Sequence, residues 1–151
     1  MTHVRRACVF AHFDRGGKVD DYVNYYLSCL FKVVDRIHFV TTCELDAKSY
    51  QLLIERDIQV TQRNNAGYDF MSYRVGLDAL NLELYDEVVI CNDSVYGPFF
   101  DLQAIFRSMN SKDCDFWGIT ESQEISRHIQ SYFVVFKAVV LSHEAFLKFW
   151  S

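Results

Sequence analysis

Three oxygen-bearing side chains, Asn92, Asp93 and Ser94, directly follow the apolar run 88–91. The chain's only proline, Pro98, comes shortly after them. The pattern predicts a buried strand that ends in a polar turn, and ligands of open α/β sheets bind outside the carboxyl ends of strands. A hard cation such as Mg²⁺ needs only one or two carboxylates there when substrate phosphates complete its shell. The alternative is a structural turn, because Asn, Asp and Ser bond to their own backbone.

A second polar stretch, residues 63–69, holds Arg63, Asn64, Gly67 and Asp69. It precedes the apolar run 88–91 by one helix and is expected to serve the same crevice. One interpretation is a loop that closes on a nucleotide through backbone amides and Arg63. The other is a strand-to-helix turn with Asp69 as the N-cap residue. The two roles are compatible.

A third stretch alternates polar and apolar residues, which places His128, Gln130 and Tyr132 on one face of a predicted strand. His128 is a candidate for contact with a phosphate or a sugar hydroxyl, and its alternative is an ordinary polar position at a strand start. A thiol nucleophile at Cys91 is disfavoured, because that residue lies inside an apolar run without an evident activating base.

Composition excludes several function classes. The chain has 151 residues and a formal net charge of −5, which argues against general nucleic-acid binding. The sequence has neither a P-loop nor a Gly-x-Gly-x-x-Gly fingerprint. Its five cysteines are widely spaced without a Cys-x-x-Cys pair, which is typical of a reduced protein. No apolar run reaches the ~18–20 residues of a membrane span. We expect a cytoplasmic protein, either free or peripheral at the inner membrane surface.

The elements that must position these residues alternate between strands and helices. This alternation predicts an α/β fold: a Rossmann-like, mostly parallel sheet with helices on both faces. One of the last two strands is expected to run antiparallel, because a polar, non-helical stretch joins them. We expect a single domain over residues 1–151, from a longer protein. Strands are predicted at 4–13, 36–42, 58–60, 87–92, 116–120 and 130–136, and helices at 19–31, 46–56, 70–80, 99–109 and 139–150.

Taken together, four motifs resemble the rhamnan synthesis protein F family, which are bacterial glycosyltransferase-like proteins of cell-wall and O-antigen polysaccharide assembly. The resemblance runs from about Arg63 to Trp150, and the first sixty residues match only in their general pattern. The motifs are Arg63-Asn64-x-x-Gly67-Tyr68-Asp69-Phe70, Asn92-Asp93-Ser94-Val95-Tyr96-Gly97-Pro98, Asp115-x-Trp117-Gly118-Ile119-Thr120 and His128-Ile129-Gln130-Ser131-Tyr132-Phe133.

The resemblance implies a fold of the GT-A glycosyltransferase type, in which an Asp-x-Asp motif holds a divalent metal on the diphosphate of a nucleotide-sugar. Asn92-Asp93-Ser94 stands at the position of that motif, with Asn and Ser in place of its outer aspartates. Asp93 and Ser94 are therefore the expected ligands of Mg²⁺ or Mn²⁺. The implied reaction transfers a sugar, for example rhamnose from dTDP-rhamnose, to a growing glycan acceptor.

The resemblance also suggests roles for the other polar residues. The donor-binding set comprises Asp14, Arg63, Asn64, Gly67, Asp69, Asn92, Asp93, Ser94, His128 and Gln130. Asp14, at the end of the first strand, would meet the base or the ribose. The general base of such inverting enzymes is expected beyond Ser151, and Asp115 and Glu121 are the nearest candidates within this chain.

Two alternatives remain at this level. The first is a non-catalytic module that binds a nucleotide-sugar or a protein partner and supports other subunits or domains of a larger synthase. The second is a phosphorelay receiver, which would use Asp14 and Asp93 as strand-end carboxylates and Lys137 after a late strand. Donor hydrolysis without acceptor would separate the enzyme from the binding module.

Overall fold

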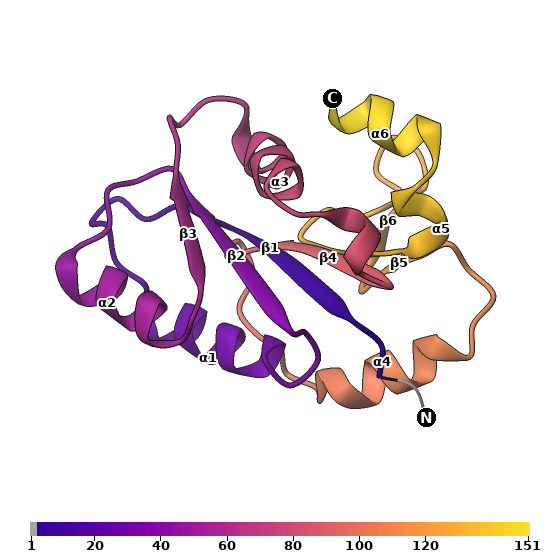
Figure 1. Ribbon diagram of the computed structural model, residues 1–151, viewed down its shortest axis with the longest axis horizontal. Helices are drawn as coiled ribbons and strands as arrows, with labels where there is room; N and C mark the ends of the chain where they lie inside the picture. The colour runs from indigo at the N-terminus through magenta and orange to yellow at the C-terminus, as the bar shows by residue number, and fades with distance from the viewer. Residues whose placement is uncertain (1–2) are drawn as a thin grey trace.

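The computed structural model describes residues 3–151 as three layers, with a six-stranded sheet between two layers of helices. Helices α1, α2 and α4 cover one face, and α3, α5 and α6 cover the other (Figure 1). The elements are β1 Arg6–His12, α1 Asp21–Leu30, β2 Arg36–Thr41, α2 Ala47–Glu55, β3 Gln59–Gln62, α3 Tyr68–Asp78, the 3₁₀ helix η1 Leu82–Leu84, β4 Glu87–Asn92, α4 Leu102–Asn110, β5 Phe116–Gly118, β6 Glu121–Ser122, β7 His128–Ile129, β8 Phe133–Lys137, α5 Ala138–Leu141 and α6 Glu144–Trp150.

The strand order is β3-β2-β1-β4-β8-β5, and β6 pairs with β7 in a separate two-stranded hairpin. Strands β1 to β4 are parallel to one another, whereas β8 runs antiparallel to both of its neighbours, β4 and β5. The predicted fold class is therefore confirmed, including the antiparallel strand near the end of the chain.

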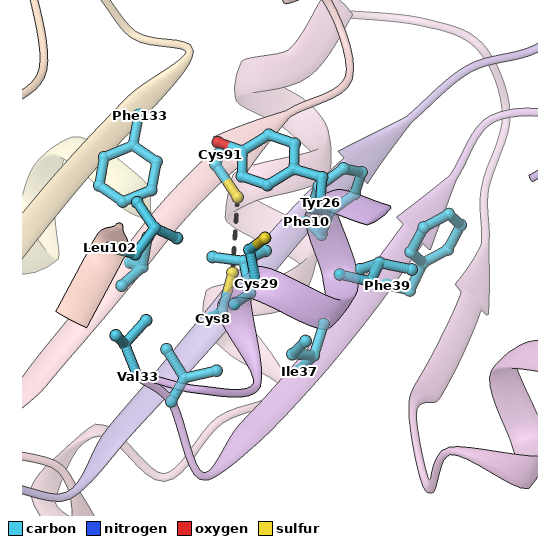
Figure 2. Close-up of a cluster of buried hydrophobic side chains, with 14 of the residues drawn as sticks. Cys8, Phe10, Tyr26, Cys29, Val33, Ile37, Phe39, Cys91, Leu102 and Phe133 are labelled. Atoms are coloured by element: carbon cyan, nitrogen blue, oxygen red, sulfur yellow. Dashed lines mark hydrogen bonds between the residues drawn. The ribbon is translucent and has the colours of Figure 1, made fainter. Parts of the chain in front are cut away.

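The two innermost strands divide their side chains between two cores, as continuous apolar runs do in sheets covered on both faces. In β1, Cys8 and Phe10 point toward α1, while Ala7 and Val9 point toward α3. Figure 2 shows the first core, where the sulfur atoms of Cys8 and Cys91 lie 3.5 Å apart. Burial raises the pKa of the Cys91 thiol well above its usual value. This environment argues against Cys91 as a nucleophile.

The predicted boundaries differ most from the structure at three places. Helix α4 begins at Leu102 rather than at residue 99, because Asp101 caps it by accepting a hydrogen bond from the Gln103 amide. The predicted helix 139–150 is broken into α5 and α6, since the imidazole of His143 caps α6. The predicted strand 130–136 is β8, which begins only at Phe133.

Helix α3 lies close against β1 because Gly76 has no side chain. A Cβ atom at Gly76 would lie 2.2 Å from Cγ1 of the fully buried Val9. We expect Gly76→Ala to lower the free energy of unfolding by about 1–3 kcal/mol, the usual cost of overpacking. Urea denaturation measures this cost, and Val9→Ala in the same chain should recover part of it. A Gly76→Ala protein as stable as the parent would contradict this packing.

Candidate functional site

The polar triplet lies at the point where the order of the parallel strands reverses. Strands β1 and β4 are parallel neighbours, and β2 and β3 continue from β1 on the other side. The carboxyl ends of β1 and β4, at His12 and Asn92, therefore flank a topological switch point, where ligands of open α/β sheets bind.

Asp93 is held directly across this switch point. One of its carboxylate oxygens accepts a hydrogen bond from the Phe13 amide at 3.1 Å, so the side chain bridges from β4 to the end of β1. The hydroxyl of Tyr22, on α1, donates to the main-chain carbonyl of Asp93 at 3.1 Å. Only 13% of the Asp93 side chain is exposed. Its position is thus fixed from three elements.

The charge around Asp93 is unusual. Burial, together with the negative charges of Asp69 and Asp14, raises the pKa of the Asp93 carboxyl to about 6, against the opposing effect of the Phe13 amide. A carboxylate with a raised pKa beside two further carboxylates marks a site that lacks positive charge. A cation would relieve this repulsion, and perturbed groups of this kind cluster at functional sites.

Asn92 organises the turn around Asp93. Its side-chain nitrogen Nδ2 donates to the Asp69 carboxylate at 2.6 Å. Its side-chain oxygen Oδ1 accepts hydrogen bonds from both the main-chain amide and the hydroxyl of Ser94. The structural turn expected from the sequence is therefore present. The same bonds bring Asp69, from the start of α3, into contact with the end of β4.

The triplet offers a modest set of metal ligands. Among residues 3–151, no three His, Cys, Asp or Glu side chains converge as a metal site would require. Asp93 and Ser94 supply one carboxylate and one hydroxyl, which suits Mg²⁺ because that ion keeps several waters and takes substrate phosphates as ligands. A metal at this position would need its remaining oxygen ligands from water or from a bound phosphate.

Asp14 lies on the turn that follows β1. Its carboxylate accepts hydrogen bonds from the amides of Gly16 and Lys18 at 2.7 and 2.9 Å. These bonds, that to Lys18 foremost, lower the pKa of Asp14 and keep it ionised. The turn is closed by Gly17, which has a left-handed backbone with φ of 68°. Asp14 thus shapes the turn after β1 and adds negative charge near Asp93.

Arg63 is used to hold its own loop. Its guanidinium donates to the Ser72 hydroxyl at 2.8 Å and to the main-chain carbonyls of Asn64 and Ala66, both at 2.6 Å. Gly67 adopts a left-handed conformation and is the N-cap residue of α3. The predicted N-cap role of Asp69 is wrong, because Asp69 lies inside the first turn of the helix, from which it reaches Asn92.

We expect Arg63→Lys to loosen this loop although it keeps the charge. An ammonium group cannot reproduce the planar fork that binds several carbonyls at once. Losing hydrogen bonds from a charged donor should cost about 1.5–3 kcal/mol and speed amide hydrogen exchange over residues 64–68. The matched control is Arg74→Lys, which alters only an exposed pair with Asp78. Equal exchange in both variants would contradict the structural role of Arg63.

The remaining predicted residues lie apart from this group. Asp115, Glu121 and His128 line a cavity of about 950 Å³ between the β6–β7 hairpin, β8 and α6. Glu121 pairs with Arg127 at 2.8 Å, and the His128 imidazole donates to the Ser126 carbonyl. This cavity is mostly apolar, whereas the carboxylates gather at the ends of β1 and β4. We therefore place the candidate site at the strand ends rather than in the larger cavity.

Two expectations about these residues are wrong. His128 and Gln130 do not share one face of a strand, because β7 ends at Ile129; the Gln130 amide instead donates to the Thr120 carbonyl at 2.9 Å. Lys137 pairs with Glu87 at the amino end of β4, the opposite end from Asp93. The arrangement that a phosphorelay receiver needs is therefore absent.

The aromatic residues that follow the triplet were not predicted as part of a site. Tyr96, Phe99 and Phe100 lie in the loop between β4 and α4 and are strongly exposed. The available signal was the pair Pro98 and Asp101, since a proline followed by a capping residue delays the start of a helix. A prediction that used this signal would have placed Phe99 and Phe100 outside α4.

Curated relatives match part of the chain. It is 39% identical over 75 residues to virulence protein VirA of Vibrio anguillarum, covering 47% of this chain and 23% of VirA. It is 34% identical over 98 residues to the uncharacterized protein y4gN of Sinorhizobium fredii, covering 60% of this chain and 25% of y4gN. The chain thus spans about a quarter of the length of these relatives.

Solved structures share the fold at low identity. The 4-diphosphocytidyl-2C-methyl-D-erythritol synthase of Anaerococcus prevotii is 14% identical, with a TM-score of 0.61 over 97% of this chain and 75% of that protein. S. aureus TarS, residues 1–349, is 13% identical, with a TM-score of 0.59 over 91% of this chain and 48% of that protein. Glucosyl-3-phosphoglycerate synthase of Mycobacterium tuberculosis in complex with UDP is 7% identical, with a TM-score of 0.60 over 91% of this chain and 58% of that protein.

These likenesses confirm a GT-A-like fold of the kind found in glycosyltransferases and nucleotidyltransferases. The family model of rhamnan synthesis protein F matches residues 37–151, so the match begins well before the first of the four sequence motifs, at Arg63. Most of the chain is covered. The chain therefore belongs to the rhamnan synthesis protein F family.

Proposed function

We propose that this chain binds the nucleotide-sugar donor of a glycosyltransferase that builds a bacterial cell-surface polysaccharide. The observation that carries the proposal is Asp93, a nearly buried carboxylate held at the β1–β4 switch point with a pKa raised to about 6. The family and the fold support a donor of this class, since the Mycobacterium tuberculosis relative in fold was solved with UDP.

The charge of the site dictates how a donor would bind. The diphosphate of a nucleotide-sugar is negative and would be repelled by Asp14, Asp69 and Asp93. A divalent cation held by Asp93 and Ser94 would reverse the sign of the local field at the phosphates. We therefore expect the donor and Mg²⁺ or Mn²⁺ to bind together. The family name favours dTDP-rhamnose as the donor and a rhamnan chain as the acceptor.

A thermal-shift titration tests the donor role. Wild-type protein is titrated with dTDP, UDP and GDP, each with and without Mg²⁺ or Mn²⁺. A ligand at 100 times its Kd stabilises the fold by roughly 2.7 kcal/mol, which is roughly 5–10 °C for a domain of this size. We expect such a shift with one nucleotide in the presence of metal.

Two variants locate the response. Asp93→Ala should abolish the shift, while Asp115→Asn, in the separate cavity, should preserve it. A shift that survives Asp93→Ala would place the nucleotide elsewhere. No shift with any nucleotide would contradict the donor role and leave a module that binds a protein partner.

A further inference from the structure

A group of aromatic side chains follows the candidate donor site directly. In the loop 94–101 between β4 and α4, the exposed fractions of Tyr96, Phe99 and Phe100 are 73%, 83% and 78%. Aromatic residues normally supply much of a core, so three of them standing in solvent within five positions is an unusual arrangement. All three line the same cavity, and an exposed apolar group of this kind marks an interaction site.

The loop is part of the wall of a small cavity. The cavity measures about 240 Å³. Tyr26 and Phe133, both buried in the first core (Figure 2), form part of its lining. Drug-sized ligands occupy roughly 300–1,000 Å³. A cavity below that range has room for a single sugar ring rather than a whole nucleotide.

The lining carries no charge. None of the residues that form the cavity wall is Asp, Glu, Lys, Arg or His. The polar side-chain atoms of its lining residues are tyrosine hydroxyls, among them that of Tyr132, which accepts a hydrogen bond from the Thr120 hydroxyl at 2.9 Å. Apolar walls with a few well-placed hydroxyls suit a neutral, hydroxyl-bearing ligand. The diphosphate belongs instead beside Asp93.

The cavity is tied structurally to the donor site. The Tyr96 ring packs edge-on against Tyr22 with centroids 4.8 Å apart, and Tyr22 bonds to the main chain of Asp93. Tyr25, on the same helix, donates to the carbonyl of Pro98 at 3.2 Å. Helix α1 therefore holds the aromatic loop and Asp93 in a fixed relation. A ligand on these rings would lie beside the sugar donor.

Resting on the proposed function, we propose that Tyr96, Phe99 and Phe100 form the binding surface for a neutral sugar of the acceptor glycan. The C–H face of a pyranose ring is apolar and stacks on aromatic rings, while its hydroxyls meet the tyrosine hydroxyls. The openness of the three rings suits an extended chain rather than an enclosed donor sugar. A membrane surface fits less well, because residues 94–102 include no Lys or Arg to attract anionic lipid.

Saturation-transfer NMR with a rhamnose trisaccharide methyl glycoside tests the proposal. The probe is used at about 10 mM, ten times a Kd of 1 mM. We expect transfer from wild-type protein and at least a tenfold weaker affinity in Phe99→Ala/Phe100→Ala. Both residues are exposed, so the fold should survive. The matched control is Phe149→Ala, an exposed aromatic on α6, which should bind the probe like the wild type.

Separate measurements distinguish the possible failures. The metal-dependent shift with a nucleotide should be unchanged in Phe99→Ala/Phe100→Ala. Its absence from wild-type protein with dTDP, UDP and GDP alike would refute the donor role while the sugar-binding result stood. No transfer from wild-type protein, or full transfer from the double variant, overturns the acceptor surface. A double variant that binds dTDP-rhamnose more weakly but binds dTDP as well as the wild type would also overturn it, because that result would indicate a site for the donor sugar. Aromatic-dependent binding to phosphatidylcholine vesicles would likewise overturn it, in favour of a membrane surface.

Discussion

Asp93→Asn should make the protein more stable at pH 7.5 while removing its metal-dependent nucleotide binding. The folded protein holds the Asp93 pKa at about 6, above the ordinary value of 3.8, chiefly because the side chain is buried. Ionisation of this group above pH 6 therefore costs folding free energy. An asparagine keeps the acceptor oxygen for the Phe13 amide without the charge. We expect a gain of roughly 1–3 kcal/mol.

The sign of this effect depends on pH. Between the unfolded pKa near 4 and the folded pKa near 6, the folded protein binds the proton that the unfolded chain releases, so the wild type gains stability as pH falls. Below pH 4 both states are protonated and the advantage of Asp93→Asn disappears. Thermal unfolding of both proteins from pH 4 to 8 measures the difference.

The exposed Asp113 supplies the control for the Asp93 experiment. Asp113→Asn removes the same charge from the surface, so its unfolding midpoint should follow that of the wild type across the pH range. If the unfolding midpoints of Asp93→Asn and Asp113→Asn changed with pH in the same way, or if Asp93→Asn were less stable than the wild type at pH 7.5, Asp93 would not be a carboxylate whose ionisation costs folding free energy. Such a trade of stability for function is common at active sites.

Arg6→Met should produce the largest loss of stability. The Arg6 guanidinium donates to the Glu87 carboxylate at 2.5 Å, and the two side chains are only 11% and 7% exposed. The guanidinium also lies 4.8 Å from the centre of the Phe106 ring. Removing it leaves a buried carboxylate without its cation, which typically costs 3–5 kcal/mol. We expect the unfolding midpoint to fall by roughly 6–20 °C.

The double variant Arg6→Met/Glu87→Leu distinguishes the cost of an unpaired buried charge from the cost of lost packing. Replacing a buried ion pair with apolar side chains is often neutral or stabilising, so most of the loss should be recovered. Arg127→Met, which breaks an exposed pair with Glu121, should barely change the midpoint. If the double variant is as unstable as Arg6→Met, the cost lies in lost packing rather than in an uncompensated charge.

The sequence predicted the elements whose patterns are strongest. The continuous apolar runs in β1 and β4 and the three- and four-residue periodicity of α1 identified a parallel sheet covered on both faces. Short elements with mixed signals were placed less well. The sequence analysis began this helix at Phe99, but the Asp101 cap excludes Phe99 and Phe100 from α4. Local capping, rather than periodicity, decided that boundary.

Contacts between distant residues account for what could not be predicted at the site. The bond between Asn92 and Asp69 joins residues 23 positions apart, and that between Asp93 and Phe13 joins residues 80 apart. Neither spacing carries a local signal. The sequence could propose that strand-end residues meet, because parallel strands share an edge. It could not show that His128 and Glu121 would turn away into a separate hairpin.

The most direct test of the donor site is to locate a metal-bound nucleotide on the protein. Paramagnetic broadening by Mn²⁺ with dTDP would be recorded on the amide spectrum of the 151-residue chain. We expect the amides of Phe13, Asp93 and Ser94 to broaden first, while those around His128 and Trp150 in the larger cavity stay sharp. Broadening centred on His128 and Trp150, with Asp93 unaffected, would contradict it.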